Sequence, residues 1–205
     1  MYSSNYFFKS NTFSLSLTFL TFFMLFAFSF FIVESAHAAT FRWDNGGGDD
    51  NWSTSNNWKG DSVPPNDGTA DVKVTGTTSN IDIDTDLDLN SLTVSSSYSG
   101  TISVTTSGSN KSVTTTGDFV VNTSSAKFVA NDSTIDVNGS FKVNAGTVSS
   151  TSGNLKVQGN LDFKGGKFDE RLGTVVLDGN TTPVDIKPDG EVFNNLKISK
   201  SSNSD

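Results

Sequence analysis

The sequence contains no cysteine and only one histidine, His37, among its 205 residues. Without cysteine there are no disulfides and no thiol chemistry, which suits a bacterial secreted surface protein better than a small eukaryotic secreted domain. Cations are also scarce: 14 Lys and Arg stand against 22 Asp and Glu, and the net charge is -8. Because no cluster of Lys or Arg forms a stripe that could bind phosphates, we expect no nucleic-acid partner.

Long apolar runs are confined to the N-terminus. A Phe- and Leu-rich run over residues 15–33 is followed by small residues at Ala36 and Ala38. This pattern predicts a secretory signal peptide, residues 1–38, cleaved after Ala38. An uncleaved membrane anchor is the alternative, because about 19 apolar residues approach the length that spans a bilayer. Cleavage would remove His37 and with it any Ser/His/Asp or Cys/His nucleophile system and any histidine metal site in this chain.

The remaining chain is rich in Ser, Thr, Asn, Asp and Gly, and its second half repeats. Gly117, Gly139, Gly159 and Gly179 stand 22, 20 and 20 residues apart. Each interval begins with an alternating apolar segment: Phe119-x-Val121, Phe141-x-Val143 and Leu161-x-Phe163. An apolar site follows in the middle of the interval: Phe128-Val129, Val148 and Phe168. Each interval closes with a second alternating segment: Ile135-x-Val137, Leu155-x-Val157 and Val175-x-Leu177. Three short alternating segments in a fixed phase predict an all-β solenoid with rungs of about 20 residues over residues 69–198, with looser coils up to residue 116.

Stacking of such rungs fixes the environment of each side chain. Apolar residues of successive rungs should form inner columns, such as Phe119, Phe141 and Leu161, because side chains alternate between the two faces of a strand. Asn138 and Gln158 each precede a glycine, as Asp178 does. We expect these polar residues to share hydrogen bonds between rungs, and the glycines to permit a bend.

All three tryptophans, Trp43, Trp52 and Trp58, lie within residues 39–68. We predict that this segment is a compact N-terminal cap that covers the first rung, because an open strand edge promotes aggregation. The alternative is a platform of exposed tryptophans that binds a glycan.

Two stretches carry a family resemblance. The opening Trp43-x-x-Gly-Gly-Gly, Asn51-Trp52-Ser53, Asn57-Trp58 and Val63-Pro64 is similar to the tryptophan-rich start of autotransporter-like bacterial surface proteins. The later Gly173–Gly179 segment and Phe193-Asn194-Asn195-Leu196-Lys197-Ile198 resemble the repeat of that group. The resemblance implies a right-handed parallel β-helix that is secreted or held at the cell surface, associated with the outer membrane or extracellular.

The end of the chain departs from that pattern. Residues 199–205 form a polar tail without a closing cover, and we expect the chain to be a shortened product or a fragment of a longer surface protein. The membrane would then be involved only through export or through a C-terminal region outside this chain.

The segment Ile81–Leu89 alternates apolar residues with four aspartates, Asp82, Asp84, Asp86 and Asp88. Aspartates two apart on one strand lie about 6.6 Å from each other, so calcium is the one cofactor to consider. The glycine-punctuated calcium nonapeptide is absent from the sequence, and a solvated acidic face is the simpler interpretation.

For function we predict a noncatalytic, exported shaft with a structural or adhesive role, whose partners would be glycans or surface proteins of a host or the environment. One alternative is a carbohydrate-binding module or a polysaccharide lyase or hydrolase, for which Asp162, Asp169 and Arg171 on successive turns are the candidates. Another is ice or mineral binding by threonine ladders, suggested by Thr105-Thr106 and Thr114–Thr116. We predict no catalytic residue and no further cofactor.

Overall fold

The computed structural model describes residues 39–105, 109–180 and 184–199. The predicted signal peptide, residues 1–38, and residues 200–205 of the predicted tail lie outside the described residues. Within the described ranges, no helix is long and apolar enough to cross a membrane.

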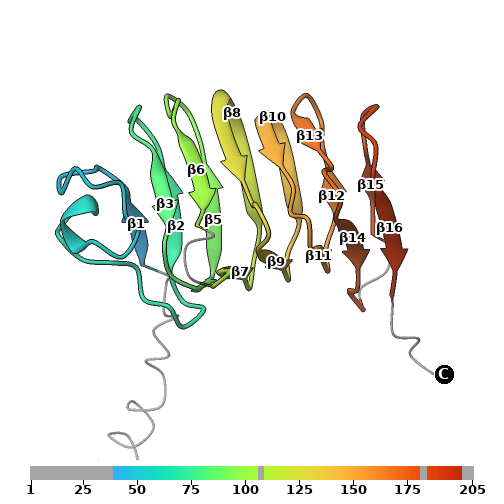
Figure 1. Ribbon diagram of the computed structural model, residues 1–205, viewed down its shortest axis with the longest axis horizontal. Coiled ribbons are helices and arrows are strands. Elements are labelled where there is room, and N and C mark those ends of the chain that lie inside the picture. The colour runs from blue at the N-terminus through green and yellow to red at the C-terminus, as the bar shows by residue number, and fades with distance from the viewer. Residues whose placement is uncertain (1–38, 106–108, 181–183, 200–205) are drawn as a thin grey trace, which may run out of the picture. The chain divides into compact units, whose positions relative to one another are not determined.

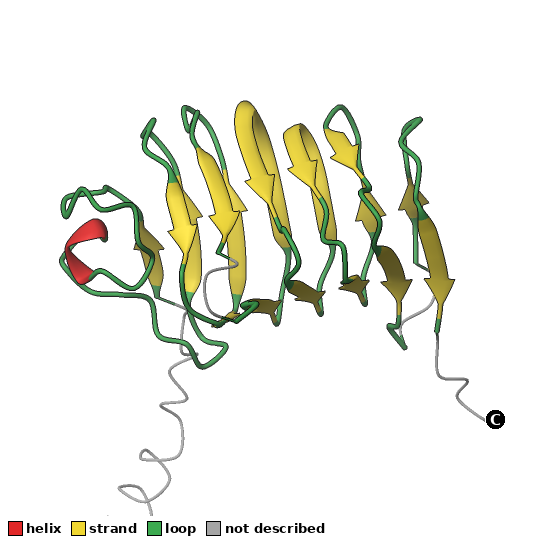
Figure 2. Cartoon of the chain, viewed as in Figure 1, coloured by secondary structure: helices red, strands yellow, loops and turns green. Residues whose placement is uncertain are grey.

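The described residues form a parallel β-solenoid with rungs of about 21 residues, and a short 3₁₀ helix, η1 (Ser55–Asn57), precedes its first rung. The strands pair into a 10-stranded and a 6-stranded parallel sheet. Figure 1 shows the rungs side by side along the chain, and Figure 2 shows that strands and turns account for nearly all of it. The predicted all-β solenoid is therefore confirmed, while its right-handed sense stays a prediction.

Each rung passes through three walls. The first wall holds β1 (Thr40–Arg42), β2 (Asp71–Val74), β5 (Ser91–Val94), the starts of β8 (Phe119–Val129) and β10 (Phe141–Ser149), β12 (Leu161–Asp162) and β15 (Ile186–Lys187). The second wall holds the mid-rung strands: β3 (Ile81–Ile83), β6 (Thr101–Val104), the ends of β8 and β10, and β13 (Lys167–Asp169). The third wall is the smaller sheet: β4 (Leu87–Leu89), β7 (Ser112–Thr115), β9 (Thr134–Val137), β11 (Asn154–Val157), β14 (Thr174–Leu177) and β16 (Asn195–Ile198).

The predicted inner columns are present in the expected register. Phe119 pairs with Phe141, and Phe141 pairs with Leu161, in parallel strands of the first wall. Val121 pairs with Val143 in the same wall, and both side chains are fully buried. The second and third walls repeat the arrangement, with Val148 between Phe128 and Phe168, Leu155 between Ile135 and Val175, and Val157 between Val137 and Leu177. The apolar phase assigned from the sequence is therefore correct.

Aromatic contacts run through the core between rungs. The ring of Phe119 lies 5.2 Å from that of Phe141, edge to face, and Phe141 lies 6.1 Å from Phe163 in the same manner. Such pairs add about 0.5–1.5 kcal/mol beyond the burial of their area. The aromatic rings therefore help to fix the spacing of neighbouring rungs.

The irregular first coils, residues 69–116, join the same stack. Val72 pairs with Leu92, and Leu92 pairs with Phe119, so the register passes unbroken into the regular repeat.

The repeat glycines are needed because the backbones of neighbouring rungs approach closely, and not because the chain adopts an unusual backbone angle there. A β-carbon on Gly159 would lie 2.6 Å from the carbonyl oxygen of Gly139, which stacks beneath it. No repeat glycine has a positive φ, in contrast to Gly146 and Gly165 at other corners. The predicted bend is thus a point where stacked backbones leave no room for a side chain.

Val143→Asp tests the columns. The substitution places a charge where the side chain is fully buried, so we expect the free energy of unfolding to fall by about 4 kcal/mol. Urea denaturation followed by circular dichroism measures this change. The control, Asn144→Asp, adds the same charge at the neighbouring exposed position and should change stability by less than about 0.5 kcal/mol. Equal stability of the two variants would show that the assigned phase is wrong.

Candidate functional site

The tryptophan-rich segment packs inward. Trp58 contacts Trp43 at 5.1 Å and Trp52 at 4.6 Å between ring centroids, and none of the three residues is more than 2 % exposed. Two of the indole N–H groups have partners, since Trp58 donates to the carbonyl of Trp52 at 2.8 Å and Trp43 donates to the hydroxyl of Ser79 at 3.1 Å. The glycan platform of exposed tryptophans does not fit this structure, because no ring face is open to a sugar.

Asn57, at the end of η1, organises the loops around these rings. Its side-chain oxygen accepts hydrogen bonds from the backbone N–H groups of Gly47 and Gly48, at 2.9 and 3.1 Å. Its side-chain nitrogen donates to the Asp49 carboxylate at 2.6 Å and to the carbonyl of Asn51 at 2.9 Å. Asn57 is fully buried and uses its amide in four hydrogen bonds, so no other residue type can replace it without loss.

Asn57→Ala should lower the free energy of unfolding by about 3 kcal/mol, because it removes four hydrogen bonds of a fully buried side chain and leaves a cavity in its place. Urea titration with tryptophan fluorescence reports on this segment directly. The control is Asn56→Ala, one residue earlier and exposed, for which we expect a change within about 0.5 kcal/mol. A loss of similar size in both variants would contradict the role assigned to Asn57.

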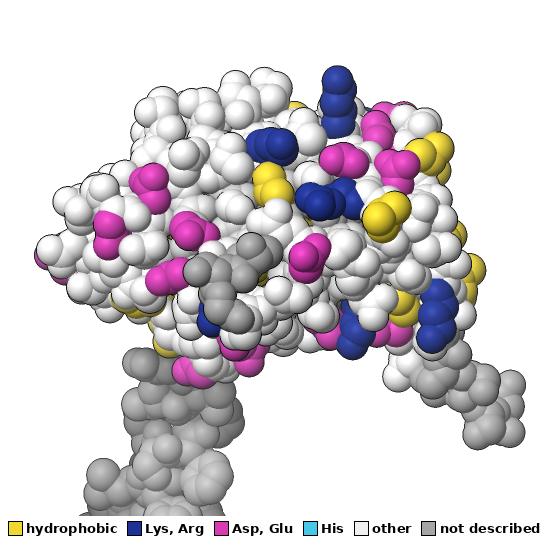
Figure 3. Space-filling model, in the orientation of Figure 1, with side chains coloured by type: hydrophobic (Ala, Val, Ile, Leu, Met, Phe, Trp, Pro, Cys, Tyr) yellow, Lys and Arg dark blue, Asp and Glu magenta, His cyan; other side chains and the backbone are white. Residues whose placement is uncertain are grey.

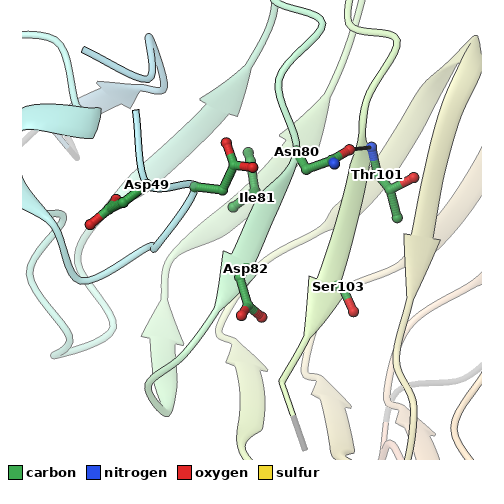
Figure 4. A pocket seen from close by; sticks show the side chains of 7 residues that line it. Asp49, Asn80, Ile81, Asp82, Thr101 and Ser103 are labelled. Carbon is green, nitrogen blue, oxygen red and sulfur yellow. Dashed lines mark hydrogen bonds between the residues drawn. The ribbon is translucent and has the colours of Figure 1, made fainter. Parts of the chain in front are cut away.

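A shallow cavity of about 350 Å³ lies where this segment meets the second wall. We call it the groove; its lining residues are Asp49, Asp50, Asn80, Ile81, Asp82, Thr101 and Ser103. In Figure 4, Asp82 and Ser103 project from the neighbouring strands β3 and β6, while Asp49 points away from them. Asn80 accepts a hydrogen bond from the backbone N–H of Thr101 at 3.0 Å, so its oxygen is held at the rim. The groove is thus polar and rich in carboxylates.

The carboxylates at the groove differ in their affinity for protons. Hydrogen bonds from Thr54 and Asn57 lower the pKa of Asp49 from 3.8 to about 2, so its negative charge is fixed. Burial raises the pKa of Asp82, and the nearby charges of Asp84 and Asp50 raise it further. One groove therefore contains a carboxylate that holds its charge and another that resists ionisation, a pattern that binding and acid–base sites share.

Asp82→Asn should raise the melting temperature at pH 7. The pKa of Asp82 is raised in the folded state, so ionisation disfavours folding and stability falls as the pH rises from the unfolded to the folded pKa. The gain should shrink as the pH is lowered toward the ordinary carboxyl pKa of about 4, where Asp82 is protonated in both states. Scanning calorimetry between pH 4 and 7 measures it. Asp61→Asn removes an exposed charge as the control, and a gain from Asp82→Asn that does not vary with pH would argue against this explanation.

The aspartate run does not line one strand. β3 ends at Ile83 and β4 begins at Leu87, so Asp82 and Asp88 lie on two different walls, and Asp84 and Asp86 lie in the corner between them. Asp84 accepts hydrogen bonds from Ser53, and Asp86 accepts hydrogen bonds from Ser112. Within the described ranges, no group of three Asp, Glu, His or Cys side chains is placed to hold a metal ion. Two of the calcium candidates thus anchor neighbouring loops and strands.

The carboxylates considered for catalysis are also separated. Asp162 lies on the first wall and accepts a hydrogen bond from the backbone N–H of Lys164 at 3.0 Å. Asp169 lies on the second wall of the same rung, not on a successive one, and accepts a hydrogen bond from Ser149 at 3.0 Å. Arg171 follows in the turn before β14, with φ of 49°. The structure therefore places these three residues along one rung rather than on facing turns.

The polar residues before the repeat glycines behave as expected only in part. Gln158 donates a hydrogen bond to the side-chain oxygen of Asn138, which links two rungs. Asp178 has a buried carboxylate oxygen without a hydrogen-bond partner among the described residues. The predicted ladder thus joins two of its three members.

Sequence reasoning missed the groove. Asp50 and Asp82 are far apart in the chain. They meet because Asn51 forms a parallel bridge with Asp82, and because the backbone N–H of Trp52 donates a hydrogen bond to the carbonyl of Asp82 at 2.8 Å. The one available signal was the density of carboxylates, since residues 39–105 hold ten Asp and three Lys or Arg.

Comparison of the chain with protein-family models, with curated proteins and with solved structures gives no match. The structure supports the coarser part of the family resemblance, a parallel β-solenoid with a repeated rung. The autotransporter-like identity rests on the sequence motifs alone.

Proposed function

We propose that this chain is an exported, noncatalytic surface protein whose solenoid is a structural or adhesive shaft. The observation that carries the proposal is the outer face of the second wall, where one row of side chains continues from the groove along successive rungs. Thr101 pairs with Lys127, Lys127 with Thr147, and Thr147 with Lys167. Hydroxyl and ammonium groups therefore recur about every 4.8 Å along the axis.

This row suits repeated, shallow contacts with an extended partner. Thr101 and Thr147 are half-buried, whereas both lysines are exposed. Hydroxyl donors and acceptors on a rigid face can match the hydroxyl groups of a glycan, and ammonium groups add attraction to acidic sugars or acidic protein segments. Each contact is weak, so adhesion depends on many rungs acting together.

Binding of the exported chain to immobilised acidic and neutral glycans, and to extracellular matrix proteins, tests the adhesive role. We expect Lys127→Ala combined with Lys167→Ala to weaken binding about tenfold or more, because both ammonium groups of the row are lost. Lys73→Ala combined with Lys164→Ala removes two exposed lysines outside the row and should leave binding unchanged. Equal binding by both double variants, or no binding by the unaltered chain, would refute the adhesive role.

Export is tested separately. Mass spectrometry of the protein released by a bacterial host should find a mature N-terminus at Ala39 or Thr40. A chain retained in the cytoplasm would remove the basis for any surface role.

The groove favours a second candidate, action on or binding of a polysaccharide. Asp50 and Asp82 line the same cavity, and the pKa of Asp82 is raised, which is the condition for a carboxyl group that donates a proton. Release of reducing sugar or of unsaturated products from pectin-like and alginate-like polymers, abolished by Asp82→Asn, would support an enzyme. Unchanged binding and no release would leave the shaft as the better proposal.

A further inference from the structure

The apolar columns end on an open face. Among the described residues, the exposed large apolar side chains all lie from Leu172 onward: Leu172, Ile186, Val192, Leu196 and Ile198, with exposures between 37 % and 79 %. Three of them occupy inner-column positions, since Ile186 stacks on Leu161, Leu196 on Val175 and Ile198 on Leu177. Figure 3 shows hydrophobic side chains toward this C-terminal end of the stack. We call the surface formed by β15, β16 and Val192 the end face.

Among the described residues, no segment covers the end face, since its large apolar side chains are 37 % to 65 % exposed. The opposite end of the solenoid is closed, because Trp43, Trp52 and Trp58 are buried there and Lys59 donates a backbone hydrogen bond to Arg42 of β1. Head-to-tail stacking of two copies would set apolar columns against polar turns. Pairing of two end faces would set the apolar side chains of one copy against those of the other.

The backbone of β15 is arranged for such a pairing. The N–H groups of Leu161 and Phe163 donate to the carbonyls of Asp185 and Lys187, at 3.0 and 2.9 Å. Alternate residues of a strand direct their backbone groups to opposite edges, so the N–H and C=O of Ile186 point to the open edge. A twofold axis through Ile186 would let the two copies of this residue exchange both hydrogen bonds, as a narrow antiparallel pair does.

The flanking charges fit the same axis. Asp185 and Lys187 stand on either side of Ile186, form an ion pair at 3.3 Å, and are 59 % and 60 % exposed. Antiparallel pairing about Ile186 places Asp185 of each copy opposite Lys187 of the other, so opposite charges meet twice. The same axis exchanges the second and third walls, which sets Leu196 and Ile198 of one copy against the region of Val192 of the other.

We propose that the end face docks a second copy of this chain, tail to tail, with β15 of one copy antiparallel to β15 of the other. The dimer is isologous, extends the inner column across the axis and covers the open strand edges, which otherwise invite uncontrolled pairing.

Charge reversal tests the interface. Sedimentation equilibrium of the exported chain should show a dimer. Lys187→Asp and Asp185→Lys should each weaken dimerisation at least about tenfold, because two cross-strand pairs change from attraction to repulsion together. The double variant that carries both changes restores opposite charges and should dimerise like the unaltered chain. An equimolar mixture of the two single variants should form a heterodimer. Lys73→Asp makes the same charge change on β2, away from the end face, and is the control.

Circular dichroism verifies that every variant is folded, which the exposure of both positions favours. Ile198→Glu adds an apolar-face test, and it should weaken the dimer without altering the spectrum. A monomer at all concentrations, or filaments in place of a dimer, would overturn the proposal. So would a dimer that is indifferent to both single reversals, or one that the double variant fails to restore, since each outcome places the contact elsewhere.

Discussion

In-register stacking of apolar side chains is the interaction on which the rest of the structure depends. Each rung exposes two edges and an incomplete core, and ordering about 20 residues costs more free energy than one rung's apolar side chains recover. Phe141 illustrates the solution, because it lies between Phe119 and Leu161 and is almost completely buried by them. Stability therefore belongs to neighbouring rungs together, and each column must keep its phase from one rung to the next.

The same constraint explains why the fold was predictable from the sequence. A column needs an apolar residue at the same position of every rung, so the spacing of Phe119, Phe141 and Leu161 already reports the register. Corners carry no such requirement. For that reason the pattern leaves open whether the aspartate run forms one strand or two, since alternation of apolar and polar residues continues through the corner.

The groove was less predictable, because it depends on contacts outside the repeat. Asp50 reaches the second wall only through the bridge between Asn51 and Asp82, and no periodicity relates the two segments. The environment of the tryptophans was hard to predict for the same reason, because it also depends on contacts outside the repeat. Their number is compatible with either a closed cap or an exposed platform, and the burial of the rings depends on loops that the hydrogen bonds of Asn57 hold around them.

The two ends of the solenoid illustrate why function should be sought away from the regular rungs. Inside the stack the inner positions form columns, and the outward row through Thr147 alternates between threonine and lysine from one rung to the next. The N-terminal segment interrupts the repeat and brings Asp50 beside Asp82, where burial raises the pKa of Asp82 and the charges of Asp84 and Asp50 raise it further. At the other end the repeat stops being covered, and Ile186 presents both a side chain and a backbone edge. Distinct chemical environments in this chain therefore occur at the N-terminal segment and at the last described rung, which lies open. The rungs between them supply length, rigidity and a repeated outer surface.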